Sequence, residues 1–120
     1  MKTHSIRLEG FVPTKKNGKM AWRGRVVIDP KKKAQIAWLE LQARKAWGRR
    51  PPLKRVGIRV RFHVAHHRAD MDGKYTTVQD ILEKAGVIVN DNTLHVVHHS
   101  CWAFKTGRDE CLVTIREMAE

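Results

Sequence analysis

Five of the twelve acidic residues in this chain lie close together, between positions 70 and 91. Asp70 and Asp72 are separated by one residue, which in an extended segment points both carboxylates to the same side. Asp91 follows a short apolar run, where a third carboxylate could converge with them. Mg²⁺ prefers oxygen ligands and usually takes one or two carboxylates directly. The three aspartates are therefore candidate ligands of a divalent metal ion that activates water.

Each of these acids also has a purely structural explanation. Asp72 could mark the start of a helix, and Asp91 could be a turn residue. Asp80 and Glu83 could be solvated positions on a helix surface. An Asp-x-Asp step is a weak motif by itself, so spacing alone leaves both explanations open.

The positive charge of the chain is strong and unevenly distributed. The sequence has 24 Lys and Arg residues against 12 Asp and Glu, a formal net charge of +12. Residues 1–61 carry 18 basic and 3 acidic side chains, whereas residues 62–120 carry 6 and 9. A basic half favours a polyanionic partner, because each neutralised phosphate releases condensed counterions. We expect phosphate contacts, with simple solvation as the alternative for each, at Lys15, Lys16, Arg23, Arg25, Arg59, Arg61 and Arg68.

Length and composition restrict the class of protein. The 120 residues are predicted to form one domain, residues 1–120. A hydrophobic fraction of 42% excludes a disordered chain. No apolar run approaches the ~20 residues that a membrane-spanning helix needs. Cys101 and Cys111 are too few for a disulfide scaffold, so we expect a cytoplasmic protein with free thiols and no membrane partner.

The middle of the basic half carries the signals of a helix. Asp29 is a suitable N-cap and Pro30 fits the first helical position, so we predict a helix from Pro30 to about Trp47. Trp38 and Trp47 are expected in the core or at a dimer interface. Apolar residues at helical spacing predict that the core-facing side consists of Ala34, Ala37, Trp38 and Leu41.

The other elements are one more helix and several strands. Residues 56–65 alternate between apolar positions and Gly57, Arg59, Arg61 and His63, which predicts a strand with one buried and one basic face. A second helix is predicted to begin at Thr76 or Thr77 and to stop at Gly86. We predict further strands or hairpin arms at 4–12, 22–28, 87–89, 94–104 and 111–117, the last two joined as a hairpin. This order predicts a single small α/β (α+β) domain with two helices and a mixed, largely antiparallel sheet.

The acidic segment and the beginning of the chain together resemble the RusA family of Holliday junction resolvases. The sequence from Asp70 to Asp91 has the family's aspartate pair, short helix, glycine and acidic step after an apolar run, with no gap in the spacing. The segment from Pro13 to Asn17 is similar to the family's proline-to-asparagine loop. Length and element order also agree, so the resemblance covers nearly the whole chain.

The resemblance implies a RusA-like, dimeric, Mg²⁺-dependent endonuclease, with Mn²⁺ as a substitute metal. Asp70, Asp72 and Asp91 would bind the metal, which activates water for phosphodiester hydrolysis. Asn17 would belong to the DNA-binding loop. Two active sites in a homodimer would nick opposing strands of four-way or branched DNA during recombination and repair. The resemblance further implies a bacterial or prophage-encoded protein.

Three positions depart from the family's pattern. Gly73 replaces the usual asparagine after the second aspartate, and the acidic step is Asn90-Asp91 rather than two aspartates. The family's catalytic lysine, four residues after Asp72, is replaced by Thr76, and we predict that Lys74 takes over its role. Loss of a charge that stabilises the transition state commonly costs ~10²–10³ in rate. A weak or inactive nuclease that still binds branched DNA is therefore the first alternative.

Two histidine runs with the same spacing suggest a second alternative. His63, His66 and His67 are repeated as His95, His98 and His99, and Cys101 follows shortly after. Zn²⁺ accepts such ligands, so the chain could be a zinc-binding structural module. The spacing matches no standard zinc signature, and strand alternation would divide the histidines between two faces.

Overall fold

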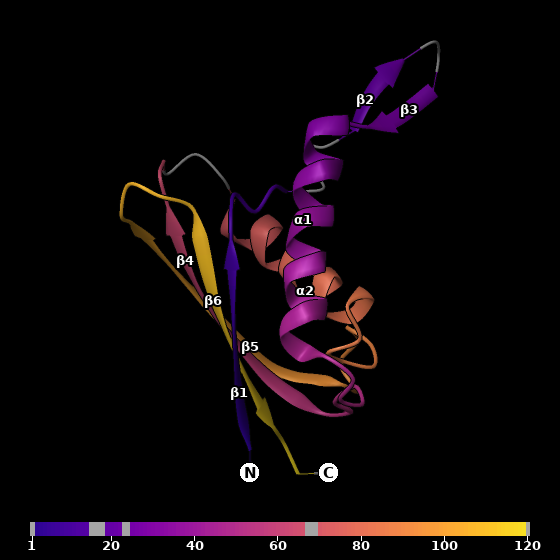
Figure 1. Ribbon diagram of the computed structural model, residues 1–120, viewed down its shortest axis with the longest axis vertical. Coiled ribbons are helices and arrows are strands. Elements are labelled where there is room, and N and C mark those ends of the chain that lie inside the picture. The colour runs from indigo at the N-terminus through magenta and orange to yellow at the C-terminus, as the bar shows by residue number, and fades with distance from the viewer. Residues whose placement is uncertain (1, 15–18, 23–24, 67–69, 120) are drawn as a thin grey trace.

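The computed structural model describes residues 2–14, 19–22, 25–66 and 70–119, without the side chains of residues 19–22 and 25–28. Within this part of the chain, three strands precede the first helix, one strand separates the two helices, and two strands follow the second helix (Figure 1). The elements are β1 (Thr3–Glu9), β2 (Lys19–Trp22), β3 (Arg25–Ile28), α1 (Pro30–Trp47), β4 (Val56–Val64), α2 (Met71–Lys84), β5 (Val96–Lys105) and β6 (Glu110–Glu117).

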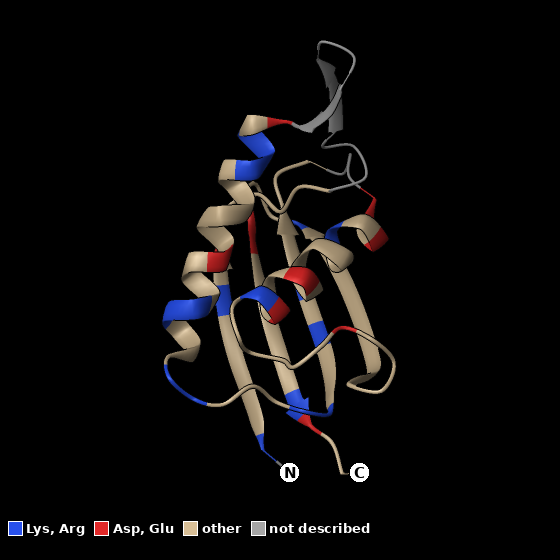
Figure 2. Ribbon diagram, turned by 90° about the vertical axis from the view of Figure 1, so that its right-hand side faces the viewer, with Lys and Arg blue, Asp and Glu red and all other residues tan. Residues whose placement is uncertain are grey.

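Four of the strands form the main sheet, in the order β1-β6-β4-β5. The β1–β6 and β6–β4 pairs are antiparallel, whereas β4 and β5 run parallel. Both helices lie against one face of this sheet, and no helix of the described residues covers the opposite face (Figures 1 and 2). The predicted class, a single α+β domain with two helices and a mixed, largely antiparallel sheet, is confirmed. The segment predicted at 22–28 contains β3, which pairs with the preceding β2 in a separate two-stranded hairpin.

The prediction that the last two strands form a hairpin is wrong. β4 lies between β5 and β6, so the 105–109 connection passes from one side of β4 to the other. β4 is therefore a central strand, and its inward-facing Ile58, Val60 and Phe62 are at most 1% exposed. The segment 87–89 also forms no strand, and pairs only through an isolated bridge between Leu53 and Ile88.

The ends of α1 agree with the prediction, but the buried side of α1 does not. Asp29 Oδ1 accepts the amide of Lys31 at 2.9 Å, and the helix ends before Gly48, whose φ is +71°. The buried residues are Leu39, Ala43 and Trp47, whereas Trp38 and Leu41 are 52% and 56% exposed. The predicted core positions Ala34 and Ala37 are exposed as well.

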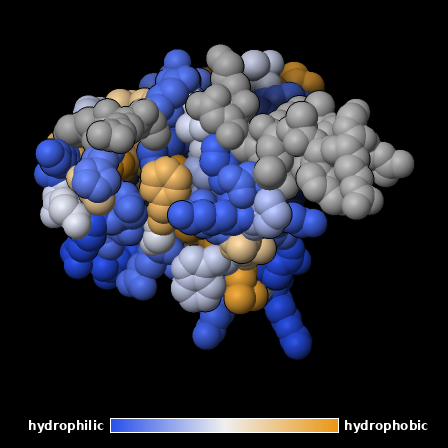
Figure 3. All heavy atoms as spheres, turned by 90° about the horizontal axis from the view of Figure 1, so that it is seen from above, coloured by the Kyte–Doolittle hydropathy of each residue, from blue (hydrophilic) through white to orange (hydrophobic). Residues whose placement is uncertain are grey.

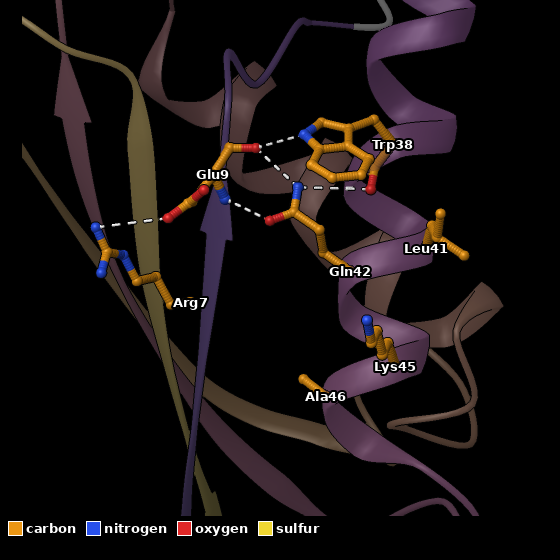
Figure 4. A pocket seen from close by; sticks show the side chains of 7 residues that line it. All are labelled: Arg7, Glu9, Trp38, Leu41, Gln42, Lys45 and Ala46. Atoms are coloured by element: carbon orange, nitrogen blue, oxygen red, sulfur yellow. Dashed lines mark hydrogen bonds and ion pairs between the residues drawn. The ribbon is translucent and has the colours of Figure 1, made fainter.

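Hydrogen bonds from two α1 side chains explain why α1 buries a different face from the one predicted. Trp38 Nε1 and Gln42 Nε2 both donate to the carbonyl of Glu9, at 3.0 and 2.8 Å, and Gln42 Oε1 accepts the Glu9 amide at 2.8 Å (Figure 4). Glu9 ends β1 at the edge of the sheet, so Gln42 replaces the strand partner that its backbone lacks. Leu41 and Trp38 line a surface hollow of about 440 Å³ beside this contact.

None of the described helices has the length and apolar character needed to cross a lipid bilayer. Seen from above, the described residues of the molecule are mostly hydrophilic, with a few apolar side chains among them (Figure 3).

Burial of the Cys111 thiol should make stability depend on alkaline pH. Burial raises the pKa of Cys111 from 9.0 to about 12. Above pH 9 the unfolded chain therefore releases this proton before the native chain does, and the free energy of unfolding falls. We expect the stability advantage of the wild type over Cys111→Ala to shrink by about 1.4 kcal/mol between pH 8 and pH 10, measured by urea unfolding. A pH-independent difference between the two proteins would contradict burial of this thiol.

Candidate active site between α2 and β5

The helix α2 begins at Met71, five or six residues earlier than predicted. Asp70 is its N-cap: Oδ1 accepts the amide of Asp72 at 3.1 Å, and the Asp70 carbonyl accepts the amide of Lys74 at 3.0 Å. An aspartate cap stabilises the first helical turn, because it satisfies a free amide and complements the helix dipole. Asp72 is therefore helical, and the extended geometry expected for the two aspartates does not occur. Residues two apart on a helix do not face the same way.

A pocket of about 450 Å³ lies between α2, the segment after it and the edge strand β5. It brings together Asp72 and Asp91, which are distant in the sequence. Asp72, Thr76 and Gln79 lie on one face of α2 because their spacing follows the helical repeat. The lining residues are Asp72, Tyr75, Thr76, Gln79, Asp91, Thr93, Val96, His99 and Cys101, so Asp70 is not among them.

Hydrogen bonds hold the segment that carries Asp91 against α2. Gln79 Nε2 donates to the Asp91 carbonyl at 2.9 Å. The side chains of Asn90 and Asn92 each accept a backbone amide two residues ahead, at 3.0 Å. Such turns fix a short loop without a strand partner. The chain after Gly86 thus returns along α2 and presents Asp91 at the pocket.

Three acids approach one another on the same side of α2. Ligand oxygens of Asp80, Glu83 and Asp91 lie within 4.8 Å of one another, and this is the only such acidic, histidine or cysteine triad in the described ranges. The triad Asp70, Asp72 and Asp91 is not drawn together to this distance. From the sequence, Asp80 and Glu83 could be solvated helix positions, and neither was predicted to be a metal ligand. The signal that could have joined them is their spacing of three residues, which places both on one side of a helix. Exposed acidic groups are common, so this grouping alone assigns no metal site.

An aromatic pair and a thiol form the floor of the pocket. Tyr75 stacks on His99 with ring centroids 4.5 Å apart and an interplanar angle of 21°. Burial raises the pKa of the Tyr75 phenol, and its buried hydroxyl has no hydrogen-bond partner among the described residues. Burial also raises the pKa of Cys101, and the negative charge of Asp72 raises it further by a smaller amount. Both groups stay protonated at neutral pH, so neither is a nucleophile there.

The predicted catalytic role of Lys74 is at odds with its position. Lys74 is 4% exposed; its Nζ donates to the Val12 carbonyl at 2.9 Å and lies 4.1 Å from the centroid of the Phe11 ring. Burial lowers its pKa, and the charge of Asp109 opposes that effect. Because the backbone is already helical at position 74, the side chain points to the interior side of α2. No Lys or Arg is among the described residues that line the pocket.

The structure gives a reason for the glycine at position 73. A Cβ atom there would meet Thr14 Cγ2 at 2.8 Å and Thr14 Cβ at 3.1 Å. We expect Gly73→Ala to lower the free energy of unfolding, because crowding of about 1–3 kcal/mol outweighs a gain in helix propensity of up to about 1 kcal/mol. In a Thr14→Ala background the loss should shrink by at least about 1 kcal/mol, measured as a double-mutant cycle. Equal losses in both backgrounds would show that Thr14 is not the obstacle.

Only part of the expected DNA-binding set can be located. Lys15, Lys16, Asn17, Arg23 and Arg68 lie outside the described residues, as does the side chain of Arg25. Arg59 and Arg61 are exposed on β4, on the face of the sheet away from the helices. They therefore do not line the pocket.

The two histidine runs do not converge. Although β4 and β5 are parallel neighbours, the register pairs His63 with Phe104, whereas His98 and His99 pair with Gly57 and Ile58. His98 and His99 consequently point to opposite faces of the sheet. His67 lies outside the described residues. A zinc site made from both runs is therefore not supported by the described histidines.

Neither a comparison with protein-family models nor one with curated proteins gives a match to this chain. The resemblance to the RusA family therefore stays a prediction from the sequence motif.

Proposed function

We propose that this protein is a RusA-like, metal-dependent endodeoxyribonuclease that cleaves four-way or branched DNA as a homodimer. The observation that carries the proposal is the pocket over β5, in which Asp72 and Asp91 are brought together from α2 and the segment that follows it. The motif that these aspartates share with the family, and the net charge of +12, support a phosphodiester substrate.

The residues of the pocket fit a hard divalent cation. Asp72 is exposed and Asp91 half-buried, so both carboxylates are accessible from one open space. Mg²⁺ typically keeps several waters and takes one or two carboxylates, and Asp72 and Asp91 are the two carboxylates among the lining residues. When bound, Mg²⁺ would lower the pKa of a coordinated water and neutralise charge on the phosphate.

The other residues of the site position these two ligands. Asp70 caps α2 and thereby fixes the backbone of Asp72. Gln79 fixes Asp91 through its carbonyl. Asp70 thus acts as a positioning residue and not as a ligand, since it does not line the pocket. The stacked Tyr75 and His99 rings, from α2 and β5, also line the pocket.

The exposed apolar side of α1 supports the homodimer. Trp38 and Leu41 are more than half exposed and line a hollow beside the edge strand β1. Apolar side chains gathered at a hollow are typical of protein–protein contacts. Two copies related by a two-fold axis would present two metal sites to opposing DNA strands.

Incubation with a labelled four-way junction tests this function. We expect paired, symmetric nicks with Mg²⁺, none with EDTA, and a loss of at least about 10²-fold for Asp72→Asn, because that carboxylate holds the metal. Asp109→Asn, which changes a carboxylate outside the pocket, is the matched control and should cleave like the wild type. Nicks that persist with EDTA or in Asp72→Asn would contradict the proposal.

A non-catalytic branched-DNA-binding protein is the second candidate. It is favoured by the absence of a lysine or arginine from the described pocket lining. Tight junction binding without nicks, in Mn²⁺ as well as Mg²⁺, would support this candidate instead.

A further inference from the structure

The face of the main sheet opposite the helices carries an aromatic and basic surface. Trp102 and Phe104 alternate with inward-facing residues on the edge strand β5 and are 44% and 45% exposed. In the register of the sheet, Arg61 lies opposite Trp102, and His63 lies opposite Phe104. We call Arg59, Arg61, His63, Trp102 and Phe104 the outer-face cluster.

Contacts inside the outer-face cluster organise its rings. The Arg59 guanidinium carbon lies 5.5 Å from the centroid of the Trp102 ring. The rings of His63 and Phe104 are 5.9 Å apart and tilted by 34°. The two aromatic side chains stand two residues apart on a strand, about 7 Å from each other. They therefore offer two neighbouring flat surfaces that remain half open to solvent.

The charges of this face favour a polyanion. Neither Arg59 nor Arg61 forms an ion pair with a described carboxylate. The acids of the face, Glu9 and Glu110, lie on β1 and at the start of β6, and both are paired with Arg7. A second copy docking face to face would bring the unpaired arginines together, and like charges at an interface oppose association.

We propose that the outer-face cluster binds single-stranded nucleic acid, with bases stacked on Trp102 and Phe104 and phosphates on Arg59 and Arg61. Aromatic rings on a basic surface bind any exposed base, since every base has a flat face, whereas duplex bases are already stacked. This site is separate from the proposed nuclease pocket: His99 and Cys101 of the same strand face that pocket, on the other side of the sheet. Binding here requires neither metal nor Asp72.

Fluorescence anisotropy in EDTA tests the proposal, with labelled oligothymidylate and oligouridylate of about 15 nucleotides and a duplex of equal length. We expect Trp102→Ala combined with Phe104→Ala to weaken single-strand binding by about 10-fold or more, with duplex binding nearly unchanged. Trp102→Phe should keep the affinity to within about threefold, because a flat ring remains, and should remove quenching of tryptophan fluorescence by the oligonucleotide. The DNA and RNA probes identify which polynucleotide is preferred.

Three results would overturn the proposal. The first is unchanged single-strand affinity in the folded double variant, with folding checked by circular dichroism. The second is equal weakening of single-strand and duplex binding. The third is a wild-type protein that sediments as a dimer while the double variant sediments as a monomer, because a second copy would then cover this face. The Asp72→Asn protein should bind the oligonucleotides like the wild type, so failure of the nuclease proposal does not affect this test.

Discussion

Replacing Thr76 by lysine should raise the rate of Mg²⁺-dependent junction cleavage by about 10²–10³-fold. Thr76 is exposed, lines the pocket and lies one helical turn after Asp72, whose carbonyl accepts its hydroxyl at 2.9 Å. No described lysine or arginine lines the pocket, because Lys74 is directed to the Val12 carbonyl instead. A lysine at position 76 would supply positive charge beside the scissile phosphate. This expectation depends on the proposed nuclease function.

Single-turnover rates on a labelled four-way junction measure the effect. Thr76→Gln is the matched control, since it lengthens the side chain without adding charge, and it should cleave at the wild-type rate. Junction affinity should be compared separately, so that tighter binding is not mistaken for faster chemistry. An unchanged or lower rate for Thr76→Lys would mean that the lack of a positively charged side chain in the pocket does not limit the rate of cleavage.

Two leucines on one helix should differ greatly in their contribution to stability. Leu39 is fully buried in α1, whereas Leu41 is 56% exposed. We expect Leu39→Ala to lower the free energy of unfolding by about 2–5 kcal/mol, because it leaves a cavity in the core. Leu41→Ala should cost less than about 0.5 kcal/mol in the monomer.

Urea unfolding of both variants checks these two values. The protein concentration should be low, because dimerisation through Leu41 would otherwise raise the measured cost of Leu41→Ala. The two substitutions have the same chemistry and the same helix propensity cost, so only burial differs. Similar losses for both, or a larger loss for Leu41→Ala, would contradict the observed orientation of α1.

Local sequence signals predicted most of the elements. Asp29 and Pro30 fixed the beginning of α1, and the alternation from Val56 onward predicted β4, because capping and side-chain period depend on near neighbours. The start of α2 was missed because the apolar pattern begins after Thr76. Asp70 was read there as a metal ligand, whereas in the structure its carboxylate caps the helix.

The candidate site could be predicted only in part. Asp72 and Asp91 were identified from their motif, but Gln79, His99 and Cys101 join them only because α2 packs beside β5. The position of Lys74 depended on the helical phase at the first turn of α2. The helix was predicted to begin after Lys74, whereas it begins before it. The direction of a side chain depends on whether its backbone is helical, so the prediction placed the lysine on the wrong side.

By itself, the sequence determined the element types, the basic charge and the acidic segment, since these follow from composition and from contacts between near neighbours. Tertiary structure alone decided which face of α1 is buried, because bonds from Trp38 and Gln42 to Glu9 join residues distant in the chain. It also placed β4 between β5 and β6. Sheet order depends on burying apolar faces from the whole chain at once, and no local pattern records that requirement.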